Sequence, residues 1–271
     1  MKKNQDRGYA SPDRRPPGAE DALPLSIQHL GMSGLRLVLA GEGLCVDPPA
    51  PVQEPVLVTW SEAERVAGAV RGGLLALPEV LRWLGRGGVA LDAARAVRWG
   101  ELRIAVRPYR PIPYATPPEA ARKALIALRR PRFAARRLAH TLRRPGDPPL
   151  AVRLDWRGVR IALCQQALHR FVSRDESDAL RAFFAGSVVA IASPDFEDEE
   201  ACGRLLADLG AAHNVLIDSI GPVRRMLGLP TRPLSTSLPW APAGTLLLED
   251  GERLALAVER RAVGSPPARV S

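Results

Sequence analysis

The segment Pro55-Val56-Leu57-Val58-Thr59-Trp60-Ser61-Glu62-Ala63-Glu64-Arg65-Val66 predicts a β-strand that runs directly into a short helix. The strand is the apolar run from Val56 to Thr59, and the helix starts at Ser61. Ser61 and Glu64 have the spacing of a capping box, in which each side chain accepts a hydrogen bond from the other residue's backbone N–H. The junction has the shape of a metal-binding strand-to-helix turn.

Two upstream segments support a family assignment together with this junction. Leu30-Gly31-Met32-Ser33-Gly34 and Val46-Asp47-Pro48 resemble the first strands of the metallo-β-lactamase superfamily, with Met32 in place of the family's histidine. Downstream, residues 150–166 resemble the hairpin that precedes the family's G-D-T motif, and residues 215–219 resemble a late strand whose end delivers a further histidine. The resemblance covers residues 24–258.

The resemblance implies an α/β (α+β) fold, a four-layer αββα metallo-β-lactamase-like sandwich with a basic helical insertion. Alternating strand and helix patterns agree with it, since two β-rich halves carry helices outside. They include a hairpin over 150–164 and helices over 176–184 and 197–209. A closing hairpin is expected over 245–258, because Asp250-Gly251 is a strong type I′ turn signal.

The family's metal ligands are substituted in this chain. The resemblance aligns H-x-H-x-D-H, which supplies ligands for two metal ions, with Trp60, Glu62, Glu64 and Arg65. It aligns the bridging aspartate with Gln165 and the late histidine with Asp218 or Ser219. Zinc needs lone-pair donors, which neither an indole N–H nor a guanidinium offers. The chain also has only 4 histidines, so we expect no catalytic residue at these positions and no cofactor, although zinc is usual for the family.

Two interpretations of Glu62 and Glu64 remain open. Their carboxylates are able to hold an oxygen-seeking ion such as Mn²⁺ or Mg²⁺. Alternatively, they stabilise the helix start, where negative charge favours the positive end of the helix dipole. The capping interpretation needs no additional ligand.

Composition limits the other possibilities. The chain has 271 residues, of which 46% are hydrophobic, so it is long enough to bury a large core. Residues 1–23 are charged and proline-rich without an apolar signal region, and we expect them to be a disordered tail, with a second tail at 259–271. Three cysteines without close spacing fit reduced thiols, which favours a cytoplasmic protein.

Residues 119–144 hold most of the net positive charge. This segment contains nine lysines and arginines and one glutamate, whereas the whole chain has a net charge of +9. It lies in a predicted helical insertion over 115–146, which Pro131 divides into two short helices. A solvated helical lid is the plain interpretation, and a partner-binding surface is the functional one. The candidate partner-binding residues are Arg122, Lys123, Arg129, Arg130, Arg132, Arg136, Arg137, Arg143 and Arg144.

These observations lead to three hypotheses. The first is a catalytically degenerate protein, or pseudoenzyme, that binds an acidic protein, an anionic membrane surface or nucleic acid through residues 119–144. A homo-oligomer in which that segment meets the acidic residues 195–200 of a neighbouring subunit is also possible. The second is an active hydrolase of esters, lactones or phosphodiesters with a rebuilt mononuclear or metal-free site. The third, weaker hypothesis is a nucleic-acid binder.

Overall fold

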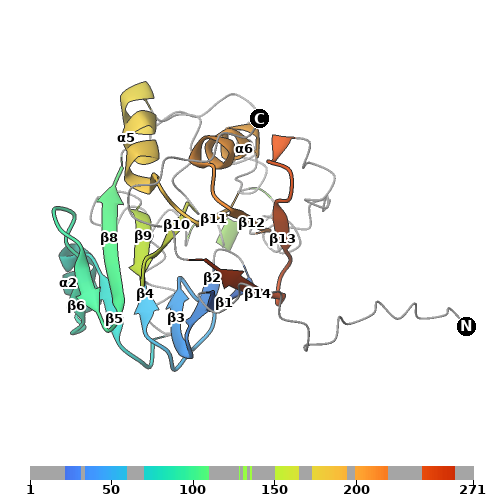
Figure 1. Ribbon diagram of the computed structural model, residues 1–271. Helices are drawn as coiled ribbons and strands as arrows, with labels where there is room; N and C mark the ends of the chain where they lie inside the picture. The colour runs from blue at the N-terminus through green and yellow to red at the C-terminus, as the bar shows by residue number, and fades with distance from the viewer. Residues whose placement is uncertain are drawn as a thin grey trace, which may run out of the picture.

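The computed structural model describes residues 22–31, 34–59, 70–109, 150–164, 173–193, 199–218 and 240–259, together with helical residues 128, 131, 132 and 135. These residues form two β-sheets with helices packed against them (Figure 1). The substituted junction after Thr59 and most of the basic insertion lie outside the described residues.

The first sheet has seven strands in the order β14-β1-β2-β3-β4-β5-β6. Pairing is antiparallel from β14 to β3 and parallel from β3 to β6. Its strands are β1 (Leu23–Gly31), β2 (Gly34–Leu39), β3 (Glu42–Val46), β4 (Val56–Leu57), β5 (Leu74–Ala76), β6 (Val89–Ala90) and β14 (Arg253–Val258).

The second sheet also has seven strands, in the order β13-β12-β11-β10-β9-β8-β7. Pairing is antiparallel from β7 to β10 and parallel from β10 to β13. Its strands are β7 (Val97–Trp99), β8 (Leu102–Pro108), β9 (Leu150–Trp156), β10 (Val159–Leu163), β11 (Val189–Ala192), β12 (His213–Ile217) and β13 (Leu246–Leu248).

Three helices of the described chain pack on these sheets. α2 (Pro78–Leu84) lies beside β5 and β6, whereas α5 (Arg174–Phe184) and α6 (Glu199–Leu209) lie over the second sheet (Figure 1). Ser173 caps α5, because its hydroxyl accepts a hydrogen bond from the backbone N–H of Glu176 at 3.2 Å. α2 begins at a proline and ends at Gly85 in the left-handed conformation, φ +59°.

The alternation of apolar side chains explains the layers. One buried cluster joins inward residues of both sheets, such as Leu37 of β2, Leu154 of β9 and Val215 of β12. A second cluster lies between the second sheet and its helices, where small side chains such as Ala162 let Phe184 and Leu206 approach. The predicted class, a two-sheet mixed α and β sandwich, is therefore confirmed.

The predicted hairpin over 245–258 is wrong in its pairing. Asp250 and Gly251 do form the turn, but β13 pairs with β12 in the second sheet and β14 pairs with β1 in the first. The turn is held from outside, since the backbone N–H of Gly251 donates to the carbonyl of His29 at 3.0 Å. The chain therefore crosses from one sheet to the other where the sequence alone favours a local hairpin.

Candidate functional site

The second sheet brings several strand ends to one edge. β10, β11 and β12 are parallel, so the residues that follow them, Cys164, Ser193 and Asp218, lie at the same edge of the sheet. β9 is antiparallel to β10 and begins at this edge. β8 ends there too, because Pro108 pairs with Leu150.

The first sheet reaches the same place through Thr59. The backbone N–H of Leu150 donates to the carbonyl of Thr59 at 3.2 Å, which joins the end of β4 to the start of β9. Asp47 follows β3, the parallel neighbour of β4. We use the name strand-end edge for the residues that follow these strands: Asp47, Thr59, Tyr109, Cys164, Ser193 and Asp218.

Asp47 and Thr59 bind each other within the strand-end edge. The backbone N–H of Thr59 donates to Oδ1 of Asp47 at 2.9 Å, and its hydroxyl donates to Oδ2. Asp47 is 1% exposed and has φ +43°, in the left-handed region that few residues other than glycine, asparagine and aspartate adopt. Both carboxylate oxygens are thus engaged in fixing the residue that precedes the substituted junction.

Gly34, the last residue of one family segment, meets the other family segment beside this pair. A Cβ atom on Gly34 would lie 2.6 Å from Cδ of Pro49 and 3.2 Å from the carbonyl oxygen of Asp47. Only glycine permits this approach, so the LG-x-SG segment packs directly on the V-D-P segment. The resemblance on which the fold prediction rests is therefore a single packing unit in three dimensions.

Cys164 presents a buried thiol at the end of β10. It is fully buried, and its backbone N–H donates to the carbonyl of Ile191 at 2.7 Å. Burial raises the pKa of the Cys164 thiol well above its ordinary value, and Cys202 of α6 adds to this effect. The two cysteines share one buried cluster, so the thiol stays protonated and is a poor nucleophile and metal ligand.

Tyr109 is an edge residue that the sequence did not reveal. It is 1% exposed and packs in the same cluster as Cys164. A usable signal was its position immediately after the apolar alternation of Leu102–Pro108, which places it at a strand end.

Most predicted site residues lie outside the described residues. Trp60, Glu62, Glu64, Arg65, Gln165 and Ser219 are among them. Asp218 is described: it is partly exposed, and its backbone N–H donates to the carbonyl of Leu248 at 3.1 Å. Of the basic candidates, only Arg132 is described, as an exposed helical residue.

The described part of the strand-end edge does not fit a zinc site. Within the described ranges, no three histidine, cysteine, aspartate or glutamate side chains lie close enough together to hold a metal ion. Asp47 accepts hydrogen bonds from Thr59, and the pKa of Cys164 is raised. Asp218 adds one partly exposed carboxylate, which is too few donors for a zinc site. We therefore derive no metal-dependent step.

None of the helices in the described part of the chain combines the length and apolar character needed to cross a bilayer.

Comparison with solved structures identifies the fold. The metallo-β-lactamase fold protein YhfI from Bacillus subtilis superposes with a TM-score of 0.55 at 11% identity, covering 86% of this chain and 99% of that one. Igni18, a metallo hydrolase from Ignicoccus hospitalis, gives 0.53 at 12% identity, covering 86% and 98%. An isothiocyanate hydrolase from Delia radicum gut bacteria gives 0.51 at 15% identity, covering 86% and 99%.

Sequence comparisons add nothing to this result. No protein-family model matches the chain, and no curated protein matches it. The structural neighbours are nevertheless covered over almost their whole length. The chain has the metallo-β-lactamase fold.

Proposed function

We propose that this chain is a catalytically degenerate metallo-β-lactamase-fold protein that binds an acidic partner through residues 119–144. Two sequence features support the proposal: Trp60 and Arg65 stand where the family has metal ligands, and the basic insertion concentrates the net charge. In this proposal Trp60 and Arg65 fill the former metal pocket, and the insertion carries the binding function.

The observation that carries the proposal is the chemistry of the strand-end edge. Its one fully buried carboxylate, Asp47, gives both oxygens to Thr59, and its one thiol, Cys164, is held protonated. Neither group is available as an anionic ligand or as a base. Catalysis would therefore depend on the substituted positions themselves.

Metal content tests the loss of the site. The purified protein, expressed in medium supplemented with zinc, manganese and iron, would be measured by inductively coupled plasma mass spectrometry. We expect less than about a tenth of an equivalent of any of these metals, because the donor set is poor. One or two equivalents that disappear in Glu62→Ala would overturn the proposal.

A second candidate function follows from the names of two structural neighbours. Igni18 is called a metallo hydrolase and another neighbour an isothiocyanate hydrolase, so a rebuilt hydrolase site deserves a test. Such a site would use Glu62 and Glu64, with Gln165 and Asp218 near. Hydrolysis of ester, lactone or phosphodiester substrates would then be abolished by Glu62→Ala and Glu64→Ala. If Glu62 and Glu64 only support the helix start, Ser61→Ala would instead cost about 1 kcal/mol of stability and no activity.

The binding role is tested on the insertion itself. We expect Arg136→Ala/Arg137→Ala to weaken binding of an acidic probe such as polyglutamate, and to reduce the salt dependence of binding. Unchanged binding would remove the insertion from the proposal. If the variant instead loses binding to anionic vesicles or to nucleic acid, the partner class is one of those.

A further inference from the structure

A row of charged side chains crosses four neighbouring strands on the outer face of the second sheet. Arg98 of β7 pairs with Arg103 of β8, Arg103 pairs with Asp155 of β9, and Asp155 pairs with Arg160 of β10. We call these four residues the arginine row. Because paired residues of adjacent strands point to the same face, the row extends about 15 Å over four strands.

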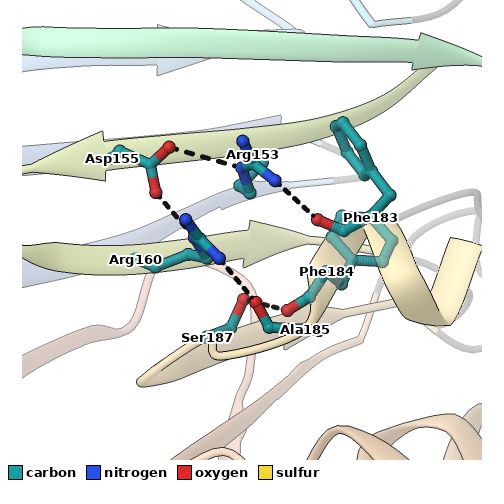
Figure 2. A network of polar contacts seen from close by, with 7 residues as sticks. All are labelled: Arg153, Asp155, Arg160, Phe183, Phe184, Ala185 and Ser187. Atoms are coloured by element: carbon teal, nitrogen blue, oxygen red, sulfur yellow. Dashed lines mark hydrogen bonds and ion pairs between the residues drawn. The ribbon is translucent and has the colours of Figure 1, made fainter. Parts of the chain in front are cut away.

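Half of the row has a structural role. Asp155 lies between two guanidinium groups, at 2.7 Å from Nε of Arg160 and 3.3 Å from Nε of Arg153 (Figure 2). These arginines also bind the end of α5, where Arg153 donates to the carbonyl of Phe183 at 3.0 Å and Arg160 to that of Ala185 at 2.7 Å. They therefore provide hydrogen-bond donors for the last backbone carbonyls of the helix.

The other acids on this face are paired as well. Glu101 binds Arg157 through contacts of 2.6 and 2.8 Å, and Glu176 lies 3.3 Å from Arg107. The described residues of β7 to β10 and the turns between them thus include six arginines and two acids, Glu101 and Asp155, and both acids have an arginine partner. The face carries a surplus of positive charge.

Arg98 and Arg103 hold most of that surplus. Both are exposed, and they stand directly opposite each other, an arrangement of like charges that destabilises a sheet. Nε of Arg98 donates only to the carbonyl of Gly100, at 3.3 Å. Arg103 has no hydrogen bond or ion pair to any described residue. Burial is the main cause that lowers the pKa of Arg153, and the charges of Arg160 and Arg103 add to it. No contact with a described residue offsets the repulsion between these two arginines, so stability does not explain the pair.

We propose that the arginine row binds the phosphate backbone of a nucleic-acid duplex, without reading its sequence. A duplex presents one negative charge per ~1.7 Å, so a row of about 15 Å meets several phosphates. Guanidinium groups suit phosphate oxygens, which they bind through two parallel hydrogen bonds. The inference concerns a surface distinct from residues 119–144 and stands independently of the proposed function.

Other partners fit this face less well. A protein partner needs apolar or aromatic anchors at the centre of its interface, and the described side chains of the row and its neighbours on this face are charged or buried. A single strand binds largely by stacking its bases on exposed aromatic rings. Phe183 is a partly exposed aromatic side chain beside the row, but its ring is covered by the Arg153 guanidinium, 5.2 Å from the ring centre. Phosphates require neither feature.

The test measures binding of a fluorescein-labelled DNA duplex of about 20 base pairs to the full-length protein by fluorescence anisotropy, between about 50 and 200 mM salt. We expect Arg98→Glu/Arg103→Glu to lower affinity by about tenfold or more and to reduce the salt slope by about two. The matched control is Arg71→Glu/Arg82→Glu, which changes net charge equally at exposed positions outside the second sheet, just before β5 and on α2. We expect the control variant to lose much less affinity for the duplex.

Several outcomes would overturn the inference. Equal losses in the two double variants would mean that only net charge matters. Tighter binding of a single strand than of the duplex, or stronger competition by polyglutamate than by the duplex, would assign the face to another partner. A loss in Arg136→Ala/Arg137→Ala with none at Arg98 and Arg103 would place duplex binding on the insertion alone. Arg98→Gln/Arg103→Gln, which removes charge without adding repulsion, keeps the test valid if the glutamate variant does not fold.

Discussion

The strand-end edge and the arginine row treat their polar groups in opposite ways. At the edge, Asp47 and Thr59 are buried and bind each other, and Cys164 is buried and protonated. On the outer face, Arg98 and Arg103 are exposed, and neither forms an ion pair with an acid of the described residues. Burial requires that a polar group find its partner inside the fold, whereas exposure leaves a charge free to meet a partner from outside.

The fold alone does not show which polar groups stabilise the protein and which are left to bind a partner. The edge is where this fold gathers its strand ends, but its described groups serve the structure of the protein. The outer face carries positive charge, at Arg98 and Arg103, that is not neutralised by an acid of the described residues. Four substitutions or titrations test this division, because each asks whether a named group works for stability or is spare.

The largest effect is expected from Asp47→Ala. The substitution leaves a buried backbone N–H and a buried hydroxyl of Thr59 without their acceptor. We expect a loss of about 4 kcal/mol in the free energy of unfolding, since each orphaned donor costs about 1–3 kcal/mol. Urea unfolding measures it, with Glu79→Ala on the exposed surface as the control. An unchanged midpoint would show that Asp47 does not hold the edge together.

Gly203→Ala tests the close packing of α6 against Trp240. A Cβ atom at this position of α6 would lie 2.2 Å from the carbonyl oxygen of Trp240 and 2.3 Å from its ring. Neither group can move far, so we expect a loss of about 3 kcal/mol in spite of the better helix propensity of alanine. Gly87→Ala is the control, because a Cβ there meets nothing within 4 Å. Equal thermal midpoints for the two variants would contradict this account.

The pH dependence of stability tests whether burial raises the pKa of the Cys45 thiol. Desolvation and the charge of Glu54 raise the pKa of Cys45 from 9.0 to about 11, whereas Arg36 lowers it. The thiol of the unfolded chain ionises at a lower pH than the thiol of the folded protein. The Cys45 thiol therefore stabilises the folded protein fully below pH 9.0, and this contribution is lost as the pH rises to about 11. We expect a difference of about 2 kcal/mol between wild type and Cys45→Ala to develop over that range. Parallel stability curves for the two proteins would argue against a raised pKa.

The smallest effect compares two arginines of the same row. Arg160→Ala removes the contacts to Asp155 and to the carbonyl of Ala185, and we expect it to cost about 1 kcal/mol. Arg103→Ala removes no hydrogen bond of the described chain, and we expect a change within about 0.5 kcal/mol. Thermal unfolding of both variants sharpens the distinction between a structural and a spare arginine. A larger loss of stability in Arg103→Ala than in Arg160→Ala would show that Arg103 also stabilises the fold.

The sequence predicted the fold where the information is local. The LG-x-SG and V-D-P segments identified the sandwich, and the structure shows why, because Gly34 packs on the backbone at Asp47. The hairpin over 150–164 was also predicted, and its turn at Arg157 and Gly158 has the two positive φ angles that a tight hairpin turn requires.

Features that depend on strand order were not predictable. The closing turn at Asp250 looked local, but its strands pair with β12 and β1, whose positions no nearby residue encodes. The arginine row needs the register of three strand pairs, and β8 and β9 are separated by more than forty residues of sequence. Tyr109 was missed for the same reason, since its burial depends on α5, α6 and β10.

The pairing of β14 with β1 has a consequence for how the protein is made. β1 pairs with β2 close by in sequence, but its second neighbour is β14 at residues 253–258, where Nε of Arg253 donates to the hydroxyl of Ser26 at 2.7 Å across 227 positions. During synthesis from the N-terminus, β1 must wait with one side open until nearly all of the chain has left the ribosome. Contacts of such long range also slow folding. Chaperone dependence during translation should therefore be concentrated at β1.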